Sequence, residues 1–217
     1  MLNDKELFRL VTFEGITPTV NATFDKLEND PYLKSDFPFR KRRFSKGVFS
    51  KNGVEWLPHE NFFQSSEIND YAGDIVREFP PLCDVFRSFI ATVLMKDEHL
   101  KMVSENAYEI GVHQIRIACD NDNPGFPTPE GAHQDGFDFV GLYCFNIENV
   151  TGGESRLLLG KKDGECVFQN VLKVGHGLVI NDKLVFHVAS PITPLNSGSG
   201  YRDICVVTYE LILDNSC

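Results

Sequence analysis

Three side chains that can bind a transition metal follow one another along the chain in the order His, Asp, His. His133 and Asp135 are two residues apart, so in a β-strand, where side chains alternate between faces, both would point the same way. His187 comes later, in the apolar and β-prone segment 183–188. Two histidines and one carboxylate that bind one face of an ion and leave its other positions open are typical of non-haem Fe(II) oxygenases. We therefore interpret His133, Asp135 and His187 as metal ligands and catalytic residues.

A basic residue on a later strand makes this interpretation more specific. The His-x-Asp spacing alone is weak, because six histidines produce one such pair by chance roughly one time in three, and a solvated turn between Gly131 and Gly136 is the alternative. Arg202, however, opens the apolar segment 201–209. A buried guanidinium requires an anion, and its planar shape suits a carboxylate such as the distal carboxylate of 2-oxoglutarate. Alternation places Thr208 on the same face, either as a second contact to that co-substrate or as an ordinary core residue.

The composition indicates a soluble globular protein. At 217 residues, with 42% hydrophobic and 24% charged residues, the chain has the size of one domain with a sizeable core. A net charge of −10 argues against nucleic acid as a partner, because phosphate binding requires a basic face. The six cysteines form no CxxC pair, and neither a signal peptide nor a transmembrane segment is recognisable. We therefore expect a reduced, cytoplasmic protein that does not bind membranes.

Hydrophobic periodicity changes from helical to strand-like near residue 108. The first half predicts a short strand at 8–13 and three helices, over residues 18–28, 68–79 and 82–94. Thr17 would cap the first helix and Pro18 would occupy its first position. The second half predicts short strands separated by Gly, Pro and Asn, at residues 109–118, 137–147, 155–159, 165–171, 177–180, 185–188 and 203–213.

This order of elements predicts an α+β fold. We expect a double-stranded β-helix (a cupin-like jelly roll) with the N-terminal helices packed outside it. No linker or repeat divides the chain, so residues 1–217 are predicted to form one catalytic domain. Residues 1–108 would provide mainly helical support, and residues 109–217 would form the jelly-roll core.

The one dense basic cluster of the sequence is Arg-Lys-Arg-Arg-Phe-Ser-Lys at residues 40–46. A solvated edge strand would explain it. The alternative is that one of its arginines faces the active-site cleft and helps to hold an anionic substrate. A nucleic-acid-binding patch is the least favoured explanation, because this is a single short run in an acidic chain.

Several blocks occur in a characteristic order: residues 111–116 (GVHQIR), the His133-x-Asp135 pair, residues 146–154, residues 185–191 (VFHVASP) and residues 201–204 (YRDI). This order resembles the small bacterial Fe(II)/2-oxoglutarate dioxygenases of the L-isoleucine dioxygenase type, and the resemblance covers residues 60–213. It implies that His133, Asp135 and His187 bind iron and that Arg202 binds the C5 carboxylate of 2-oxoglutarate. The implied reaction is O2-dependent hydroxylation of a free amino acid, with 2-oxoglutarate converted to succinate and CO2. In related halogenases the carboxylate ligand is missing, so Asp135 disfavours halogenation.

The strand at 109–118 supplies candidates for substrate binding. Gln114 and Arg116 share one strand face, and we hypothesise that Arg116 pairs with the α-carboxylate of a small amino-acid substrate. A structural salt bridge is the alternative for Arg116. His113, on the opposite face, is expected to be a hydrogen-bonded core histidine and not a fourth ligand. Glu130 and Asp138 flank the metal motif and are candidates to meet a substrate amine.

Other outcomes are compatible with the same residues. Desaturation, cyclisation or sulfoxidation would use the same iron ligands and co-substrates. Action on a peptide-linked residue would require a peptide-length groove, which nothing in the sequence indicates. A non-catalytic jelly-roll binding module would have no need of all three metal ligands together with Arg202. The sequence leaves a homodimer open.

Overall fold

The computed structural model describes residues 6–64, 73–96 and 106–213. An eight-stranded antiparallel sheet forms its base, with the strand order β1-β10-β6-β13-β5-β3-β2 and with β4 paired to β3. The strands of this large sheet are β1 (Phe8–Thr12), β2 (Glu28–Asn29), β3 (Arg40–Ser50), β4 (Gly53–Trp56), β5 (Tyr108–Cys119), β6 (Phe139–Glu148), β10 (His176–Asn181) and β13 (Gly200–Leu211).

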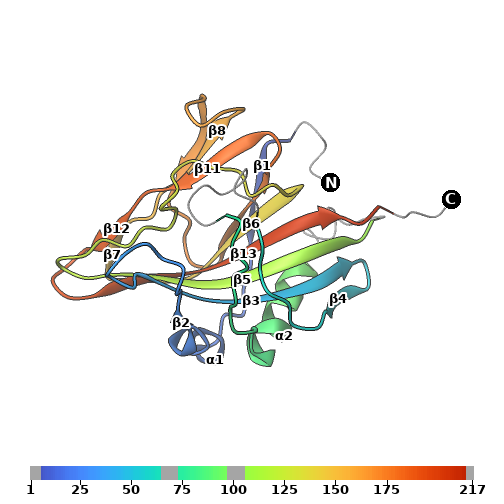
Figure 1. The fold of residues 1–217 in the computed structure, drawn as a ribbon, viewed down its shortest axis with the longest axis horizontal. Coiled ribbons are helices and arrows are strands. Elements are labelled where there is room, and N and C mark those ends of the chain that lie inside the picture. The colour runs from blue at the N-terminus through green and yellow to red at the C-terminus, as the bar shows by residue number, and fades with distance from the viewer. Residues whose placement is uncertain (1–5, 65–72, 97–105, 214–217) are drawn as a thin grey trace.

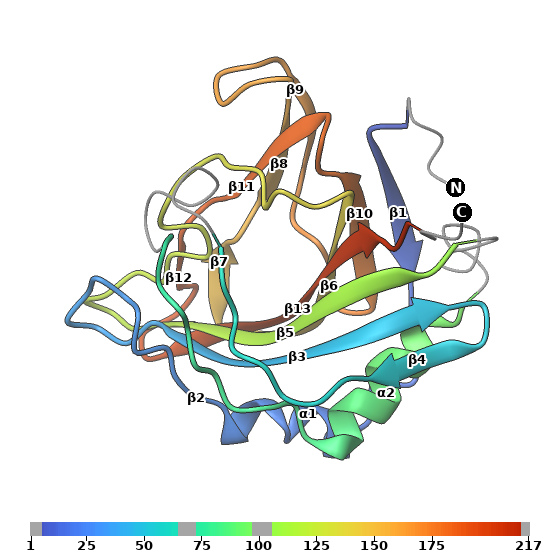
Figure 2. The same cartoon turned by 45° about the vertical axis from the view of Figure 1, so that its right-hand side comes forward.

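Two smaller sheets lie across from the large one. One has the order β11-β8-β9 and the other pairs β12 with β7. Their strands are β7 (Val150–Gly152), β8 (Ser155–Leu159), β9 (Cys166–Asn170), β11 (Val185–Ala189) and β12 (Ile192–Pro194). Figures 1 and 2 show β8 and β11 on one side of the molecule and β3, β5 and β13 on the other. This arrangement of two facing sheets is the predicted jelly roll, and the fold class is confirmed.

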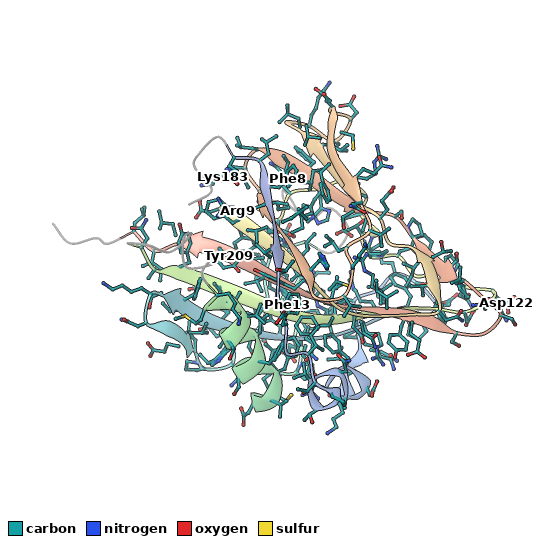
Figure 3. All side chains as sticks on the ribbon, turned by 180° about the vertical axis from the view of Figure 1, so that it is seen from behind. Phe8, Arg9, Phe13, Asp122, Lys183 and Tyr209 are labelled. Atoms are coloured by element: carbon teal, nitrogen blue, oxygen red, sulfur yellow. The ribbon has the colours of Figure 1, made fainter. Side chains whose placement is uncertain are left out.

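The helices cover the outer face of the large sheet (Figure 1). They are α1 (Pro18–Asn21), the 3-10 helix η1 (Phe24–Lys26) and α2 (Asp84–Leu94). The buried side chains of α2 form one stripe, which packs on outward-facing residues of the large sheet such as Val112 and Val207. Figure 3 shows side chains filling the space between helices and sheet. The outer face of the sheet is therefore core, and the inner face is left for the site.

Each predicted strand segment of the second half contains a strand, whereas β7 and β12 were not predicted. The first half contains less helix than predicted. Thr17 does cap α1 and accepts a hydrogen bond from Val20 N at 3.3 Å, yet α1 ends at Asn21. Thr23 Oγ1 donates to the Val20 carbonyl at 2.6 Å, so a side chain competes for a helical acceptor in a segment of weak helix formers. Of the predicted helix 68–79, residues 68–72 lie outside the described residues, and residues 73–79 are not helical.

The expectation that residues 1–108 give mainly helical support is therefore wrong. β1 pairs with β10, and β3 pairs with β5 from Arg40 to Phe49, so both halves of the chain build one sheet. The basic cluster lies in β3, which also pairs with β2 and β4 near its two ends. Arg40 and Arg42 are buried, so a solvated edge strand does not explain them. The described part of the chain contains no apolar helix with the length needed to cross a bilayer.

Candidate metal centre

The structure brings together the three predicted metal ligands. His187 lies on β11, and its backbone exchanges two hydrogen bonds with that of His133, at 3.1 and 2.9 Å. The ligand atoms of His133, Asp135 and His187 all lie within 4.8 Å of one another. Asp135 carboxylate oxygens are 3.7 Å from His133 Nε2 and 3.3 Å from His187 Nε2. Donors that bind one ion at about 2.1 Å, at right angles, lie roughly 3 Å apart, so this set is close to ligation distance.

The backbone route to this convergence differs from the one expected. His133 and Asp135 were predicted to share the face of a strand, but only His133 forms a β-bridge, and Asp135 lies in the loop that follows. Alternation along a strand therefore does not explain why both side chains point inward. Contacts to the loop itself must hold Asp135 in place.

The free ring nitrogens fit a metal site. His133 Nδ1 lies 3.0 Å from the Gly131 carbonyl and donates to it, which leaves the Nε2 lone pair available for a ligand bond. His187 Nε2 is buried and, although an Asp135 oxygen lies 3.3 Å away, it forms no hydrogen bond of acceptable geometry among the described residues. Such an orphaned nitrogen is costly in a protein interior, and metal coordination would satisfy it.

The charge of Asp135 fits as well. Burial alone would raise the pKa of its carboxyl, but the contact with His187 and the charges of His133 and His187 outweigh burial and lower the pKa below its usual value. The side chain is therefore an anion, as a carboxylate ligand must be.

Asp182, which the sequence analysis missed, fixes the loop that carries Asp135. It lies directly after β10, and its carboxylate accepts the backbone N–H groups of Asp135 at 3.2 Å, Gly136 at 2.7 Å and Phe137 at 3.2 Å. Gly136 has φ +86°, a conformation that glycine adopts without strain, and this bend lets three successive N–H groups face one carboxylate. The side chain of Asp182 thus determines where Asp135 points.

A second set of contacts reaches Asp135 from the N-terminal half. Gln64 Nε2 donates to the backbone carbonyl of Asp135 at 3.2 Å and to its Oδ1 at 3.3 Å. Arg77 Nη2 in turn donates to Gln64 Oε1 at 2.9 Å. Gln64 and Arg77 fall within the part of the chain that the family resemblance covers, but neither was assigned a role, because both lie in or beside a segment that was interpreted as a packing helix.

The metal candidate opens into a cavity between the sheets. Its floor is the inner face of the large sheet, which contributes Arg40, Arg42, His113, Ile115, Ile117, Leu142, Arg202, Ile204, Val206 and Thr208. From the other side come Ser155, Leu157 and His187. The walls are thus mostly apolar, with a few cationic groups at defined positions, as in many small-molecule sites.

Arg202 is buried in this cavity, 4% exposed. Its Nη1 donates to the Gly153 carbonyl, and its Nε has no hydrogen-bond partner among the described residues. A Cβ at Gly153 would lie 2.7 Å from Nη1, so any larger residue here would have to displace the guanidinium. Arg202 therefore presents an incompletely satisfied cation to the cavity, which fits an anionic ligand.

Thr208 lines the same cavity face as Arg202, as alternation predicted. Its hydroxyl, however, is bonded to the backbone of Gly111, which donates to Oγ1 at 3.2 Å. Thr208 lies six positions beyond Arg202 along β13, a separation of roughly 20 Å. Thr208 is too far away to share a carboxylate with Arg202, and the core-residue alternative describes it better.

Arg116 and Gln114 lie outside the cavity. Arg116 forms a two-pronged ion pair with Asp203, at 2.6 and 2.8 Å, and its Nη1 bonds Asp25 at 2.8 Å. Gln114 Nε2 donates to Thr23 at 2.7 Å. Both side chains are on the outer face of β5, so the expected contact between Arg116 and a substrate carboxylate is corrected to the structural salt bridge.

His113 is a buried, hydrogen-bonded histidine, as expected. Arg42 Nη2 donates to its Nδ1 at 2.6 Å, and its ring stacks on Phe44 with centroids 4.5 Å apart. Burial, and then the charge of Arg42, lower the pKa of His113 well below its usual value. Because arginine only donates, Nδ1 accepts and the proton of the neutral ring is on Nε2.

The two acidic residues beside the metal motif differ in their surroundings. Asp138 is paired with Lys183 Nζ and accepts from Leu211 N at 2.7 Å, away from the cavity lining. Glu130 lines the cavity, with Oε1 3.4 Å from His133 Nε2. Only Glu130 is placed to meet a bound ligand.

The sequence family described as 2OG-Fe dioxygenase matches residues 21–208, which is most of the chain. This protein belongs to that family. It is therefore an oxidoreductase that uses Fe(II), 2-oxoglutarate and O2, and the predicted family, enzyme class and cofactors are confirmed.

Named relatives and solved structures agree with this assignment. The chain is 26% identical over 197 residues to L-isoleucine-4-hydroxylase of Bacillus thuringiensis, covering 85% of this chain and 78% of that protein. It is 29% identical over 201 residues to 3(1)-hydroxy-L-isoleucine 4-dioxygenase of Pantoea ananatis, covering 86% and 78%. A bsmA homologue from Methylobium petroleophilum superposes with a TM-score of 0.79 at 26% identity, over 96% of this chain and 90% of that one. The fold also matches IDO from Bacillus thuringiensis, with a TM-score of 0.75 at 22% identity, over 98% and 93%.

Proposed function

We propose that this dioxygenase hydroxylates an aliphatic C–H bond of a free amino acid or a close derivative. The observation that carries the proposal is the convergence of His133, Asp135, His187 and the buried Arg202 on one mostly apolar cavity. The names of the two relatives, an L-isoleucine hydroxylase and a hydroxyisoleucine dioxygenase, support a free amino acid as the substrate class. The coupled reaction converts 2-oxoglutarate to succinate and CO2.

In this proposal each residue has one task. His133, Asp135 and His187 would hold Fe(II), and the Arg202 guanidinium would bind the C5 carboxylate of 2-oxoglutarate. Iron bound with its co-substrates supplies the oxidising power that breaks the C–H bond. Ile115, a residue of the cavity wall, helps to keep water away and to direct the side chain that is oxidised.

Alternative outcomes keep the same site. Desaturation, cyclisation and sulfoxidation differ only in the fate of the substrate, and product analysis separates them. A peptide-linked substrate is disfavoured by the buried arginines of the cavity, because an internal residue of a peptide brings no α-carboxylate to pair with them. A cytoplasmic location and a homodimer stay predictions from the sequence.

The test is an aerobic incubation with Fe(II), ascorbate, 2-oxoglutarate and a pool of amino acids, in which succinate and product masses are measured together. We expect a one-oxygen mass gain in one or a few aliphatic amino acids with matched succinate, and its loss in His133→Ala. A two-hydrogen loss would indicate desaturation or cyclisation instead. If no amino acid raises succinate above the background, the free-amino-acid proposal fails while the family assignment stands.

A further inference from the structure

The cavity contains more buried positive charge than the co-substrate needs. Arg40, Arg42 and Arg202 line it from the large sheet, and Arg77 lines it from the segment after residue 72. These side chains are only 8%, 7%, 4% and 3% exposed, respectively. A buried guanidinium is tolerated where an anion or several acceptors compensate it. Each of the four therefore needs a partner that can be identified.

Two of the four have obvious partners. Arg40 Nε donates to Asp30 Oδ2 at 2.8 Å, which makes Arg40 a structural ion pair. Arg202 is assigned to the C5 carboxylate of 2-oxoglutarate in the proposed function. Asp135 has its charge committed to the metal. Arg42 and Arg77 are left over.

Arg42 has an incomplete set of partners. Its Nη2 donates to His113, but its Nη1 is 3.8 Å from Asp30, which Arg40 already occupies. Its Nε is buried and has no hydrogen-bond partner within the described part of the chain. Burial, and then the charge of Arg40, lower the pKa of Arg42 to about 9, although Asp30 acts in the opposite direction. An additional anion would relieve this unfavourable environment.

Arg77 is in a similar position. Its guanidinium carbon lies 4.5 Å from the centroid of the Phe62 ring, and its Nη2 is bonded to the neutral Gln64. Its Nε is buried and has no hydrogen-bond partner within residues 6–64, 73–96 and 106–213, and no carboxylate of those residues forms an ion pair with it. Arg42 faces the same Phe62 ring at 5.8 Å. The two unfilled guanidinium groups therefore flank one aromatic side chain at the cavity wall.

This pair is separate from Arg202. In the sheet, Arg42 is opposite Ile115 on β5, and Arg202 is opposite Ile117, with β5 lying between β3 and β13. Two strand spacings put β3 roughly 10 Å from β13. A molecule of 2-oxoglutarate that uses one carboxylate on the metal and the other on Arg202 has none left for Arg42 and Arg77. Gln64 connects Arg77 to Asp135, so the pair does lie beside the metal centre.

We propose that Arg42 and Arg77 form a second carboxylate subsite, which binds the α-carboxylate of the amino-acid substrate. This inference rests on the proposed function and deepens it. It also accounts for a preference for free amino acids, because an internal residue of a peptide has no α-carboxylate and would leave two buried cations without the additional anion. The subsite would bind the α-carboxylate that all free amino acids share. The side chain of the substrate would then contact the apolar wall of the cavity.

The test removes the interaction from both sides. The substrate found in the amino-acid screen is compared with its amino alcohol, in which CH2OH replaces the carboxylate, in the wild type and in Arg42→Met. In the wild type we expect kcat/KM to favour the amino acid on the order of 100-fold, and in Arg42→Met this preference should shrink to a few-fold. The KM for 2-oxoglutarate should change by less than about threefold. Arg42→Lys should restore part of the preference, because it keeps the charge but not the planar fork.

The matched control is Arg116→Met, which removes a partly buried arginine from the neighbouring strand on the outer face. It should lower stability without changing the preference for the carboxylate. Binding of the amino acid to the Mn(II)- and 2-oxoglutarate-loaded protein, measured anaerobically by calorimetry, gives a readout that does not depend on turnover. If Arg42→Met does not fold, Arg42→Lys and Arg77→Lys replace it in the test. Both should weaken binding of the amino acid more than binding of its amino alcohol.

Three results would overturn the inference. In the first, Arg42→Met retains the full preference for the carboxylate. In the second, the variant raises the KM for 2-oxoglutarate and not that for the amino acid, which would assign the pair to the co-substrate. In the third, Arg116→Met abolishes the preference. In each case the wild type still hydroxylates the amino acid, so the proposed function survives; a wild type with no amino-acid turnover removes both.

Discussion

Asp182 positions the candidate metal centre without belonging to the ligand set. Its carboxylate gathers three consecutive backbone N–H groups of the loop that carries Asp135. Asp182 Oδ1 is also 3.8 Å from His187 Nε2, so one side chain lies beside both parts of the ligand set. Residues of this kind orient metal ligands, and their loss typically weakens metal binding by about 10- to 100-fold.

Asp182→Asn is therefore expected to weaken Fe(II) or Mn(II) binding by about 10-fold or more. The asparagine amide would point N–H donors at the N–H groups of the loop and would release Asp135. Anaerobic metal titration measures the effect. Asp138→Asn is the control, since its carboxylate bonds Lys183 and Leu211 and not the loop. Equal metal affinity in Asp182→Asn and the wild type would contradict the positioning role.

The assignment of Arg202 can be tested against Thr208. Arg202→Met should raise the KM for 2-oxoglutarate on the order of 100-fold and leave the KM for the amino acid within a few-fold, because a bidentate contact to one carboxylate is lost. Thr208→Val keeps the shape of the side chain and should leave both constants unchanged, as its hydroxyl is bonded to Gly111. Steady-state kinetics with each substrate varied in turn gives the answer. A comparable rise in the KM for 2-oxoglutarate in Thr208→Val would show that Thr208 does contact the co-substrate.

At the scale of elements, α2 supports the site from behind. It packs on the outer face of the sheet whose inner face is the cavity floor. Phe86 is fully buried between Phe24 and Phe145, with ring centroids 5.4 and 5.2 Å away. The helix therefore fixes the curvature of β5, β6 and β13 without contacting a ligand.

Phe86→Ala should destabilise the protein by about 3–5 kcal/mol, because it removes a large apolar side chain and leaves a cavity. Val85→Ala on the same helix should lower the free energy of unfolding by less than about 0.5 kcal/mol, since Val85 is 44% exposed. Chemical denaturation of both variants measures this. The KM values of folded Phe86→Ala should stay near those of the wild type; a selective rise in one of them would mean that α2 shapes the cavity directly.

Elements with one clear periodicity could be predicted from the sequence. The stripe at 82–94 became α2, and the alternating segment at 109–118 became β5. The apolar residues at 68–79 misled because three- and four-residue steps also occur by chance, and Phe79 packs against Phe44 and Phe62 without a helix in the described residues. The segment 40–46 misled in another way: charged side chains suggest solvent, and only the fold shows that Arg42 is buried.

The residues of the site likewise divide into those that could be identified from the sequence and those that could not. His133, Asp135, His187 and Arg202 were identifiable because their residue types and order suggest chemistry. Asp182 and Gln64 were not, since an aspartate in a turn and a glutamine in a loop are common residues, and their roles arise from contacts across 47 and 71 positions of the chain. Arg116 and Arg42 look equivalent in the sequence, and the pleat of two neighbouring strands sends them to opposite faces.

At the scale of the whole molecule, the site closes only when three distant parts of the chain meet. β3 and the Phe62–Arg77 bridge bring the cations of the first half, the loop after residue 131 brings two ligands, and β11 brings His187 from the opposite sheet. A metal ion bound to this set would link the large-sheet loop to the small sheet. Metal binding should therefore stabilise the entire fold and not only the loop.

We expect Mn(II) at about 100 times its dissociation constant to add about 2.7 kcal/mol, since it binds only the folded protein. For a chain of this size that corresponds to a rise in Tm of about 5–10 °C, which a chelator should reverse. His187→Ala removes one ligand and should abolish the rise, whatever its own starting Tm. His176→Ala, which alters a histidine of β10 outside the ligand set, should retain it. Thermal scans with and without metal compare the shifts directly. Because the shift reports binding and not turnover, an equal rise in His187→Ala would place the metal elsewhere even if the variant were inactive.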